Sequence, residues 1–165
     1  MIGVFYGSTT GNTEELAAQI AGKLGIESSD VYDVGRVPAD KVNSYDCLLL
    51  GSSTWGNGEL QDDWFDFIGR LKKENLSGKK IGLFGCGDSS SYPDTFCDAI
   101  GIIYEELEGS GCIFIGEVPA EEYSENESKA FKGEKVLGLA VDDDKPNLTE
   151  QRIAKWVESV KTALI

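Results

Sequence analysis

Strand and helix signals alternate along the chain, and this alternation limits the fold more than any other feature of the sequence. Short apolar runs, of the kind that form buried strands, are separated by stretches in which apolar residues recur at helical spacing. The runs cover residues 2–6, 30–34, 47–50, 80–85 and 112–115. Strands that alternate with helices in this way predict an α/β fold, in which a parallel sheet carries helices on both faces.

Four helices are expected between and after these strands, each with one apolar face. Asn12 with Glu15, and Asn147 with Glu150, have the spacing of capping boxes and are expected to begin the first and the last helix. Pro93 suits the first turn of the third helix. The apolar faces consist of Leu16, Ile20 and Leu24; of Trp64, Phe67, Ile68 and Leu71; of Phe96, Ile100, Ile103 and Leu107; and of Ile153, Trp156, Val157, Val160 and Leu164.

One stretch, residues 117–134, does not follow the alternation. It is acidic and has little periodicity, yet residues 136–141 after it again have the pattern of a strand. A connection of this length is unusual inside a compact domain. We therefore expect a single domain over residues 1–165, with an insertion at about 117–134 that splits the final strand.

The loop after the first strand has the composition of an anion site. Ser8, Thr9, Thr10, Gly11, Asn12 and Thr13 stand where a helix should begin, and the free N–H groups of a helix N-terminus favour an anion. No Lys or Arg precedes Lys23, and the glycine spacing is not that of a nucleotide-binding G-x-G-x-x-G motif. The loop therefore predicts a phosphate held by neutral donors, with a polar, well-capped turn as the alternative.

Three segments together resemble a flavodoxin, and the resemblance covers nearly the whole chain. They are Ser8-Thr9-Thr10-Gly11-Asn12-Thr13, Ser53-Thr54-Trp55-Gly56-Asn57-Gly58, and Phe84-Gly85-Cys86-Gly87-Asp88 followed by Tyr92. The split last strand is similar to the long-chain subclass, whereas the Trp-Gly pair looks like the short-chain type. The resemblance implies a doubly wound three-layer sandwich, with a five-stranded parallel sheet in the order 2-1-3-4-5 and helices on both faces.

The resemblance also implies a cofactor, non-covalently bound FMN, and a role for each segment. The first segment would hold the phosphate, and Trp55 and Tyr92 would sandwich the isoalloxazine ring. The peptide at Gly56 would turn over on reduction and stabilise the semiquinone. The remaining cofactor-binding positions implied are Ser53, Thr54, Asn57, Gly58, Cys86, Gly87 and Asp88. Ribityl contacts are implied for Thr95, Cys97 and Asp144, for which a helix surface, a core thiol and a solvated charge remain alternatives.

The function expected is that of a low-potential one-electron carrier, not an enzyme, which cycles mainly between semiquinone and hydroquinone. Histidine is absent, which removes the commonest general base. A net charge of -14 disfavours nucleic acid and anionic membranes and favours basic partner surfaces, although solubility alone could explain it. The expected partners are an NAD(P)H-dependent flavodoxin reductase and other oxidoreductases. With scattered cysteines and no secretory signal, a cytoplasmic location is expected. A monomer is expected by default.

Three other functions stay open at this point. An FMN-dependent quinone or nitro reductase could use the same fold and would oxidise NAD(P)H directly. A phosphoryl-accepting receiver domain has similar topology, but Gly7-Ser8 and Gly51-Ser52 stand where its acidic residues would be. A non-redox scaffold with an empty loop is the third. Nothing in the sequence chooses a physiological electron donor or acceptor.

Overall fold

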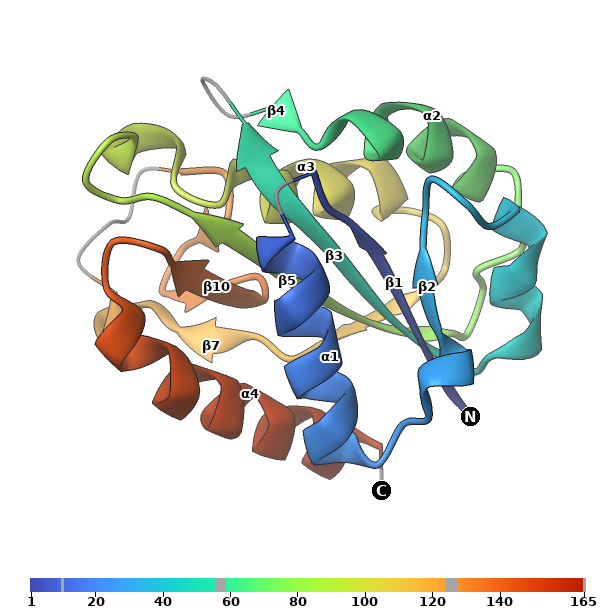
Figure 1. The fold of residues 1–165 in the computed structure, drawn as a ribbon. Coiled ribbons are helices and arrows are strands. Elements are labelled where there is room, and N and C mark those ends of the chain that lie inside the picture. The colour runs from blue at the N-terminus through green and yellow to red at the C-terminus, as the bar shows by residue number, and fades with distance from the viewer. Residues whose placement is uncertain (10, 56–58, 124–127, 165) are drawn as a thin grey trace.

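A parallel sheet forms the centre of the computed structural model, which describes residues 1–9, 11–55, 59–123 and 128–164. Its principal strands lie in the order β10-β5-β3-β1-β2, all parallel (Figure 1). When these five strands are numbered by their order in the chain, β5 is the fourth and β10 the fifth. The order in the sheet is then 2-1-3-4-5, which confirms the prediction. The bounds are β1 (Ile2–Gly7), β2 (Val31–Asp33), β3 (Cys47–Trp55), β5 (Lys80–Gly87) and β10 (Leu139–Asp142).

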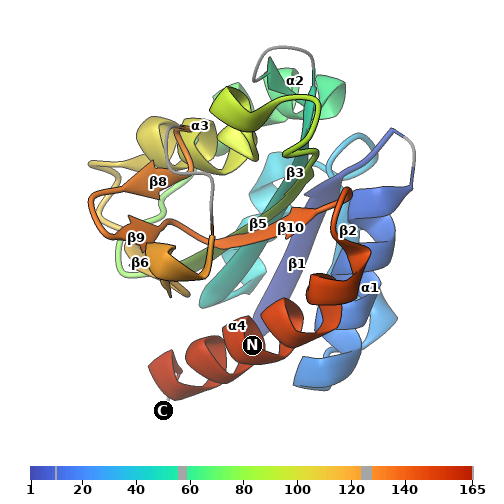
Figure 2. The ribbon, with the colours of Figure 1, turned by 90° about the vertical axis from the view of Figure 1, so that its left-hand side faces the viewer.

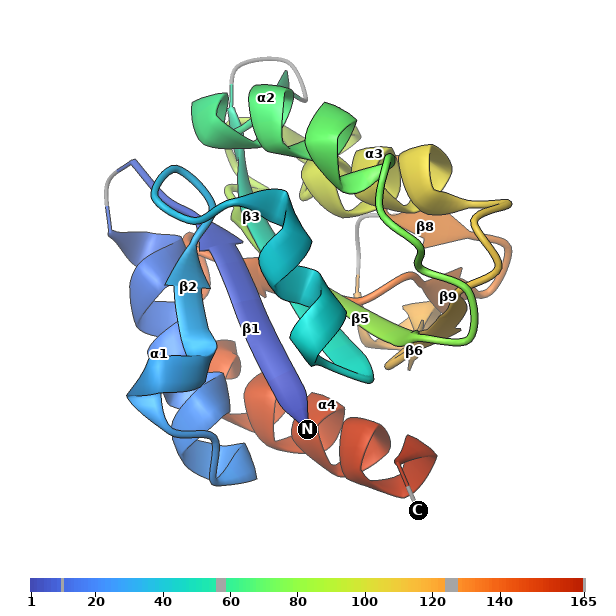
Figure 3. The same cartoon turned by 90° about the vertical axis from the view of Figure 1, so that its right-hand side faces the viewer.

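Helices cover both faces of this sheet, as expected. Figures 2 and 3 show α1 and α4 together on one face and α2 and α3 on the other. Within the described residues, no helix is long and apolar enough to cross a membrane. The α-helices are α1 (Asn12–Leu24), α2 (Asp62–Leu71), α3 (Asp98–Leu107) and α4 (Thr149–Ala163); the 3-10 helices are η1 (Ser28–Asp30), η2 (Ala39–Ser44), η3 (Pro93–Thr95), η4 (Ala120–Glu122) and η5 (Pro146–Leu148).

The core lies between the sheet and each helical layer. The central strands are buried on both faces, which is why they read as continuous apolar runs in the sequence. Two buried tryptophans pack between the sheet and the helices, and each donates its indole N–H to a backbone carbonyl. Trp64 donates to the Gly51 oxygen at 2.7 Å, and Trp156 donates to the Gly116 oxygen at 2.9 Å. A buried indole therefore adds apolar contact here without an unsatisfied donor.

The final strand is split, as predicted. β6 (Ile113–Ile115) pairs with the first part of β5, and β10 pairs with the last part of the same strand. The segment between them contains a small antiparallel sheet that the sequence did not reveal. Its strands, in the order β7-β9-β8, are β7 (Val118–Pro119), β8 (Phe131–Lys132) and β9 (Lys135–Val136).

Specific contacts attach this segment to the rest of the protein. The buried Asp98, at the start of α3, accepts a hydrogen bond from the Lys129 backbone N–H at 2.7 Å, and burial raises the pKa of its carboxyl group. Tyr123 donates its hydroxyl to the Ala140 carbonyl at 2.9 Å, while the Arg152 guanidinium lies 4.0 Å from the Tyr123 ring centroid. The segment is therefore packed onto α3 and α4 through buried groups.

Several local predictions were wrong in detail. Gly11, at φ 95°, precedes α1 and accepts the Glu15 N–H, so Asn12 is the first helical residue and not a cap. Asn147 lies within η5, and α4 begins without a side-chain cap. Pro93 opens η3, since α3 begins only at Asp98. Residues 136–141 are not one strand, because Val136 pairs within the small antiparallel sheet whereas residues 139–142 pair with β5 in the main sheet.

Candidate functional site

The segments singled out in the sequence follow neighbouring strands. The first follows β1, the second extends β3 and the third extends β5, which are adjacent in the sheet; Asp144 follows β10. Because these strands are parallel, their carboxyl ends meet at one edge. Open α/β sheets bind ligands at this edge, next to the point where the strand order reverses.

The loop after β1 is organised around the N-terminus of α1. Ser8 Oγ accepts the Gly11 backbone N–H at 3.0 Å, and Gly11 occupies a left-handed conformation that glycine adopts without strain. Thr9 is exposed, whereas Thr13 is fully buried beside the Cys86 thiol, and its Oγ1 forms no hydrogen bond of normal geometry in the described part of the chain. Thr10 lies outside the described residues.

The segment after β3 is a hairpin rather than a loop that follows the strand. The predicted strand covered residues 47–50, but β3 continues to Trp55, whose backbone pairs with Glu59 of β4 (Glu59–Leu60). Gly56, Asn57 and Gly58, at the tip, lie outside the described residues. The strand is longer than its apolar run because its polar end also has backbone partners: Ser52 and Ser53 pair with β5, and Thr54 and Trp55 pair with β4.

Two hydroxyl groups hold this hairpin in place. Thr54 Oγ1 accepts the Ala99 N–H at 3.0 Å and so satisfies a donor at the start of α3. Ser52 Oγ accepts the Gln61 N–H at 3.2 Å, just before α2. Ser52 and Thr54, on either side of Ser53, therefore bond to the starts of α2 and α3. Trp55 lies at the end of a strand that these bonds hold in place.

The loop after β5 is closed by Asp88. Its carboxylate accepts the N–H groups of Ser90 at 3.0 Å and Ser91 at 3.1 Å, and the Ser91 hydroxyl at 3.1 Å. These bonds lower the pKa of Asp88, so it carries its charge at neutral pH. The Tyr92 N–H donates to the Asp88 carbonyl at 2.9 Å, and the Tyr92 side chain is 46% exposed. The loop thus presents a large aromatic ring at the surface on a well-defined backbone.

Asp142 joins this loop to the end of β10, and the sequence analysis missed it. Its carboxylate is buried and accepts the N–H groups of Ser89 at 3.2 Å and Asp144 at 3.0 Å, and it is also hydrogen-bonded to the Ser89 hydroxyl. An acidic residue directly after the apolar run 139–141 was the signal that could have revealed it. Asp144 itself is exposed beside this junction.

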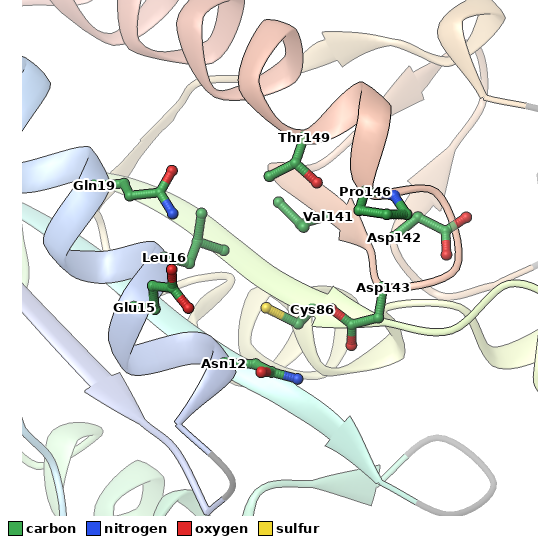
Figure 4. Close-up of a pocket in the computed structure, with 10 residues that line it drawn as sticks. All are labelled: Asn12, Glu15, Leu16, Gln19, Cys86, Val141, Asp142, Asp143, Pro146 and Thr149. Atoms are coloured by element: carbon green, nitrogen blue, oxygen red, sulfur yellow. The ribbon is translucent and has the colours of Figure 1, made fainter.

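A cavity of about 250 Å³ lies between α1 and the connection from β10 to α4 (Figure 4). The Cys86 thiol faces it, with Glu15 on one side and Asp143 on the other. Burial, followed by the charge of Asp143, raises the pKa of Cys86 to about 12, so the thiol stays protonated and unreactive. Desolvation and the charges of Asp142 and Asp88 raise the pKa of Asp143. The carboxylates that line this cavity disfavour a phosphate there.

The two remaining positions, Thr95 and Cys97, differ in accessibility. Thr95 is half-buried in η3, where it can reach a ligand. Cys97 is fully buried, with its Sγ 3.8 Å from the carbonyl oxygens of Gly85 and Val141, and burial raises the pKa of its thiol. Its side chain therefore belongs to the core, which fits the alternative that the sequence left open, and a ribityl contact through this thiol is not supported.

The donor set fits a flavin phosphate better than a nucleoside triphosphate. Hydroxyl groups and backbone N–H groups surround the start of α1, and the buried, unpartnered Thr13 hydroxyl needs an acceptor. Transfer of a terminal phosphoryl group requires a Lys or a metal ion at the phosphate. No Lys or Arg occurs in this loop, and the described residues contain no cluster of acidic residues and cysteines able to hold a metal ion.

Comparison with known proteins decides the family. The sequence model of the family described as flavodoxin matches residues 4–156. The chain belongs to the flavodoxin family. The flavodoxin of Haemophilus influenzae is 41% identical over 162 residues, which cover 97% of this chain and 93% of that protein. The Synechocystis flavodoxin is 43% identical over 165 residues, 99% of this chain and 97% of that protein.

Solved flavodoxin structures have the same architecture. The Fusobacterium nucleatum flavodoxin bound to flavin mononucleotide superposes with a TM-score of 0.89 at 26% identity, and the match covers 98% of this chain and 97% of that one. The oxidised Flavodoxin 1 of Bacillus cereus gives a TM-score of 0.68 at 31% identity, over 97% of each chain. The comparisons thus agree with the fold built from the residues.

Proposed function

We propose that this flavodoxin is a low-potential one-electron carrier that binds FMN non-covalently and passes electrons between redox enzymes, without turnover of a substrate of its own. The observation that carries the proposal is the convergence of the loops after β1, β3 and β5, with their neutral anion donors and two aromatic residues, at one edge of the sheet. The FMN-bound flavodoxin from Fusobacterium nucleatum, which has the same fold, supports it.

In this proposal each loop has one task. The N-terminus of α1 binds the phosphate with residues 8–13, and Thr13 supplies its unpartnered hydroxyl. Trp55 and Tyr92 flank the isoalloxazine ring, and an aromatic stack adds about 0.5–1.5 kcal/mol beyond the area buried. Bound FMN supplies reversible one-electron chemistry. The other positions proposed to contact it are Ser53, Thr54, Gly56, Asn57, Gly58, Cys86, Gly87, Asp88, Thr95 and Asp144.

Charge in these loops tunes the cofactor. The Asp88 carboxylate stays ionised because its loop holds it in hydrogen bonds, so it stands as a fixed negative charge beside the proposed ring site. A phosphate bound by neutral groups keeps its own negative charge. Each added electron is repelled by these charges, and the repulsion is stronger the closer the charge lies to the ring. The site therefore favours a low reduction potential.

Reconstitution with FMN followed by stepwise reduction tests the function. The protein is expected to bind FMN one to one, with visible flavin absorbance, and to take up electrons in two separate one-electron steps. It should not oxidise NADH or NADPH unless a reductase is added. Rapid oxidation of NAD(P)H by the FMN-loaded protein alone would instead support a quinone or nitro reductase, and absence of FMN binding would contradict both functions.

The proposed partners are proteins with basic docking surfaces, among them an NAD(P)H-dependent flavodoxin reductase. The support is the net charge of -14 and the exposed face at the start of α2, where Asp62 and Asp66 flank a 57% exposed Phe65. Arg70 lies 2.9 Å from Asp66, which leaves Asp62 as the less compensated charge of this pair. A single-domain cytoplasmic monomer, with the insertion at 117–134, also remains part of the proposal.

Electron transfer from a reductase is expected to slow as ionic strength rises, because salt screens attraction between exposed charges beyond about 8–10 Å. Asp62→Asn should lower the bimolecular rate at low salt by about two- to fivefold and flatten its salt dependence. Glu158→Gln is the matched control, since Glu158 is exposed on α4, on the opposite face of the sheet. Stopped-flow rates that are independent of salt, or equally affected by the two variants, would argue against docking at α2.

A further inference from the structure

Gln61 is a buried polar residue between the β3–β4 hairpin and α2 whose position suggests more than a structural role. Its side chain is only 2% exposed, and its backbone N–H donates to Ser52 Oγ on the hairpin. Its Oε1 accepts the Asp63 N–H at 3.0 Å, which satisfies a free donor in the first turn of α2. One half of the amide group therefore caps the helix.

The other half of the amide reaches the proposed phosphate loop. Since a backbone N–H can only donate, the bond from Asp63 fixes Oε1 and thereby directs Nε2 the other way. Nε2 donates to Thr9 Oγ1 at 3.0 Å and to Asp63 Oδ2 at 2.9 Å. Gln61 is thus bonded across 52 residues of sequence to the loop after β1.

This bond limits the directions open to the Thr9 hydroxyl proton. Its oxygen already accepts from Gln61, so its own proton has to be donated elsewhere, and Thr9 stands on an exposed loop beside the N-terminus of α1. Hydrogen bonds in a chain polarise one another, so a hydroxyl that accepts a bond becomes a better donor. In a loop without Lys or Arg, a well-directed neutral donor matters more.

The end of β1 is shaped around the same amide group. A Cβ on Gly7 would lie 2.3 Å from Gln61 Oε1, so the side chain packs directly against the residue from which the phosphate loop departs. The amide group is fixed by this packing as well as by its hydrogen bonds.

We propose that Gln61 is a positioning residue for the phosphate loop: it holds Thr9 and turns the Thr9 hydroxyl proton toward a bound phosphate. The proposal rests on the FMN-binding function proposed above and adds to it a residue that does not itself contact the cofactor. The bond from Gln61 Nε2 to Thr9 Oγ1 is the link between the hairpin and the phosphate site.

A double-mutant cycle with inorganic phosphate as the probe tests the proposal. Apoprotein is titrated with phosphate in four forms: unmodified, Gln61→Met, Thr9→Val and the double variant. Gln61→Met is expected to weaken phosphate binding by about five- to tenfold when Thr9 is present. With Val at position 9 the same change should have less than a twofold effect, because the hydroxyl through which Gln61 acts is gone.

Gln61→Glu, made in both backgrounds, is the second variant. It keeps an oxygen for the Asp63 N–H, and so the cap of α2, but it cannot donate to Thr9 when ionised. Its added charge acts on phosphate equally in both backgrounds and cancels in the cycle, so the extra loss of phosphate affinity when Thr9 is present should again be about five- to tenfold. Riboflavin, which lacks the phosphate, should bind all these proteins within about twofold of the unmodified chain.

The outcomes separate this proposal from the function on which it rests. Equal weakening of phosphate in both backgrounds, or parallel losses of phosphate and riboflavin affinity, would mean that Gln61 only supports the fold and would overturn the inference. Phosphate binding without any FMN or riboflavin binding would contradict the carrier function, and the phosphate cycle would still decide the role of Gln61. A protein that binds none of the three would overturn both.

Discussion

Gly7→Ala is expected to weaken FMN binding by more than tenfold and to lower the free energy of unfolding by about 1–3 kcal/mol, the usual cost of overpacking a filled interior. An added methyl group would lie 2.3 Å from Gln61 Oε1 and 2.6 Å from Trp64 Cδ1. Neither neighbour can move freely, since the Gln61 amide has three hydrogen bonds and the Trp64 indole is fully buried and bonded to Gly51.

The effect on FMN should exceed the effect on riboflavin. Gly7 is the last residue of β1 and directly precedes the loop that binds the phosphate, so a shift of its backbone displaces Ser8 and Thr9 first. Fluorescence titrations with FMN, riboflavin and inorganic phosphate, together with thermal unfolding of the apoprotein, measure both consequences.

Gly22→Ala provides the matched control for this substitution. Gly22 lies within α1, where an added Cβ meets nothing within 4 Å. Alanine there should raise stability by about 0.5–1 kcal/mol, because glycine is costly inside a helix, and should leave ligand affinity unchanged. If Gly7→Ala behaved like Gly22→Ala, the tight packing at the start of the phosphate loop would be disproved.

The sequence predicts the layers of this protein well, because its strands and helices bury continuous or periodic apolar sets. Leu16 and Ile20 are four residues apart, Trp64 and Phe67 are three apart, and each pair lies on one buried helix face in the structure. The predicted strand order follows because the resemblance covers nearly the whole chain. Both kinds of inference depend on many residues, so an error at one residue does not alter them.

The polar details were harder to predict, because each depends on a partner far away in the chain. Gln61 and Asp142 look like ordinary surface residues in the sequence, yet both are buried because Thr9 and Ser89 come to them from other loops. Cys97 stood in a segment expected to contact the ligand, but its left-handed backbone and full burial place its thiol in the core. A pattern of residue types can mark a position such as Asp142, at the end of a buried strand, but it does not say which distant residue is the partner.

The apparent capping boxes failed for a related reason. Ser, Thr, Asn and Asp are favoured at helix starts by local hydrogen bonds, but a loop that must leave backbone donors free for a ligand has other requirements. Gly11 takes the place of a capping residue before α1, and as a glycine it has no side chain to bond to the N–H groups of the first turn. A missing side-chain cap at this position is consistent with an anion as the partner of those donors.

Asp142→Ala is expected to be the most damaging substitution where the loop after β5 meets the end of β10. It removes the acceptor for the Ser89 N–H, the Ser89 hydroxyl and the Asp144 N–H. Ser89 is buried, and each buried group left without a partner costs about 1–3 kcal/mol, so we expect a total loss of about 2–4 kcal/mol in unfolding free energy. The same bonds hold the loop that carries Tyr92. Without them the loop must be ordered when riboflavin binds, so riboflavin affinity should fall about tenfold or more.

Asp142→Asn is the control that keeps the shape and one acceptor oxygen. The backbone N–H groups of Ser89 and Asp144 both point to Oδ1, which the amide oxygen can replace, and the Ser89 hydroxyl can accept from the new NH₂ group instead of donating. We therefore expect a loss of only about 1 kcal/mol and a small change in riboflavin affinity. Inorganic phosphate should bind both variants as it binds the unmodified protein, because α1 and its loop do not depend on Asp142. Calorimetric unfolding of the apoproteins and the two titrations test this together, and a loss of phosphate affinity in Asp142→Ala equal to that of riboflavin would show that the two halves of the site are not held separately.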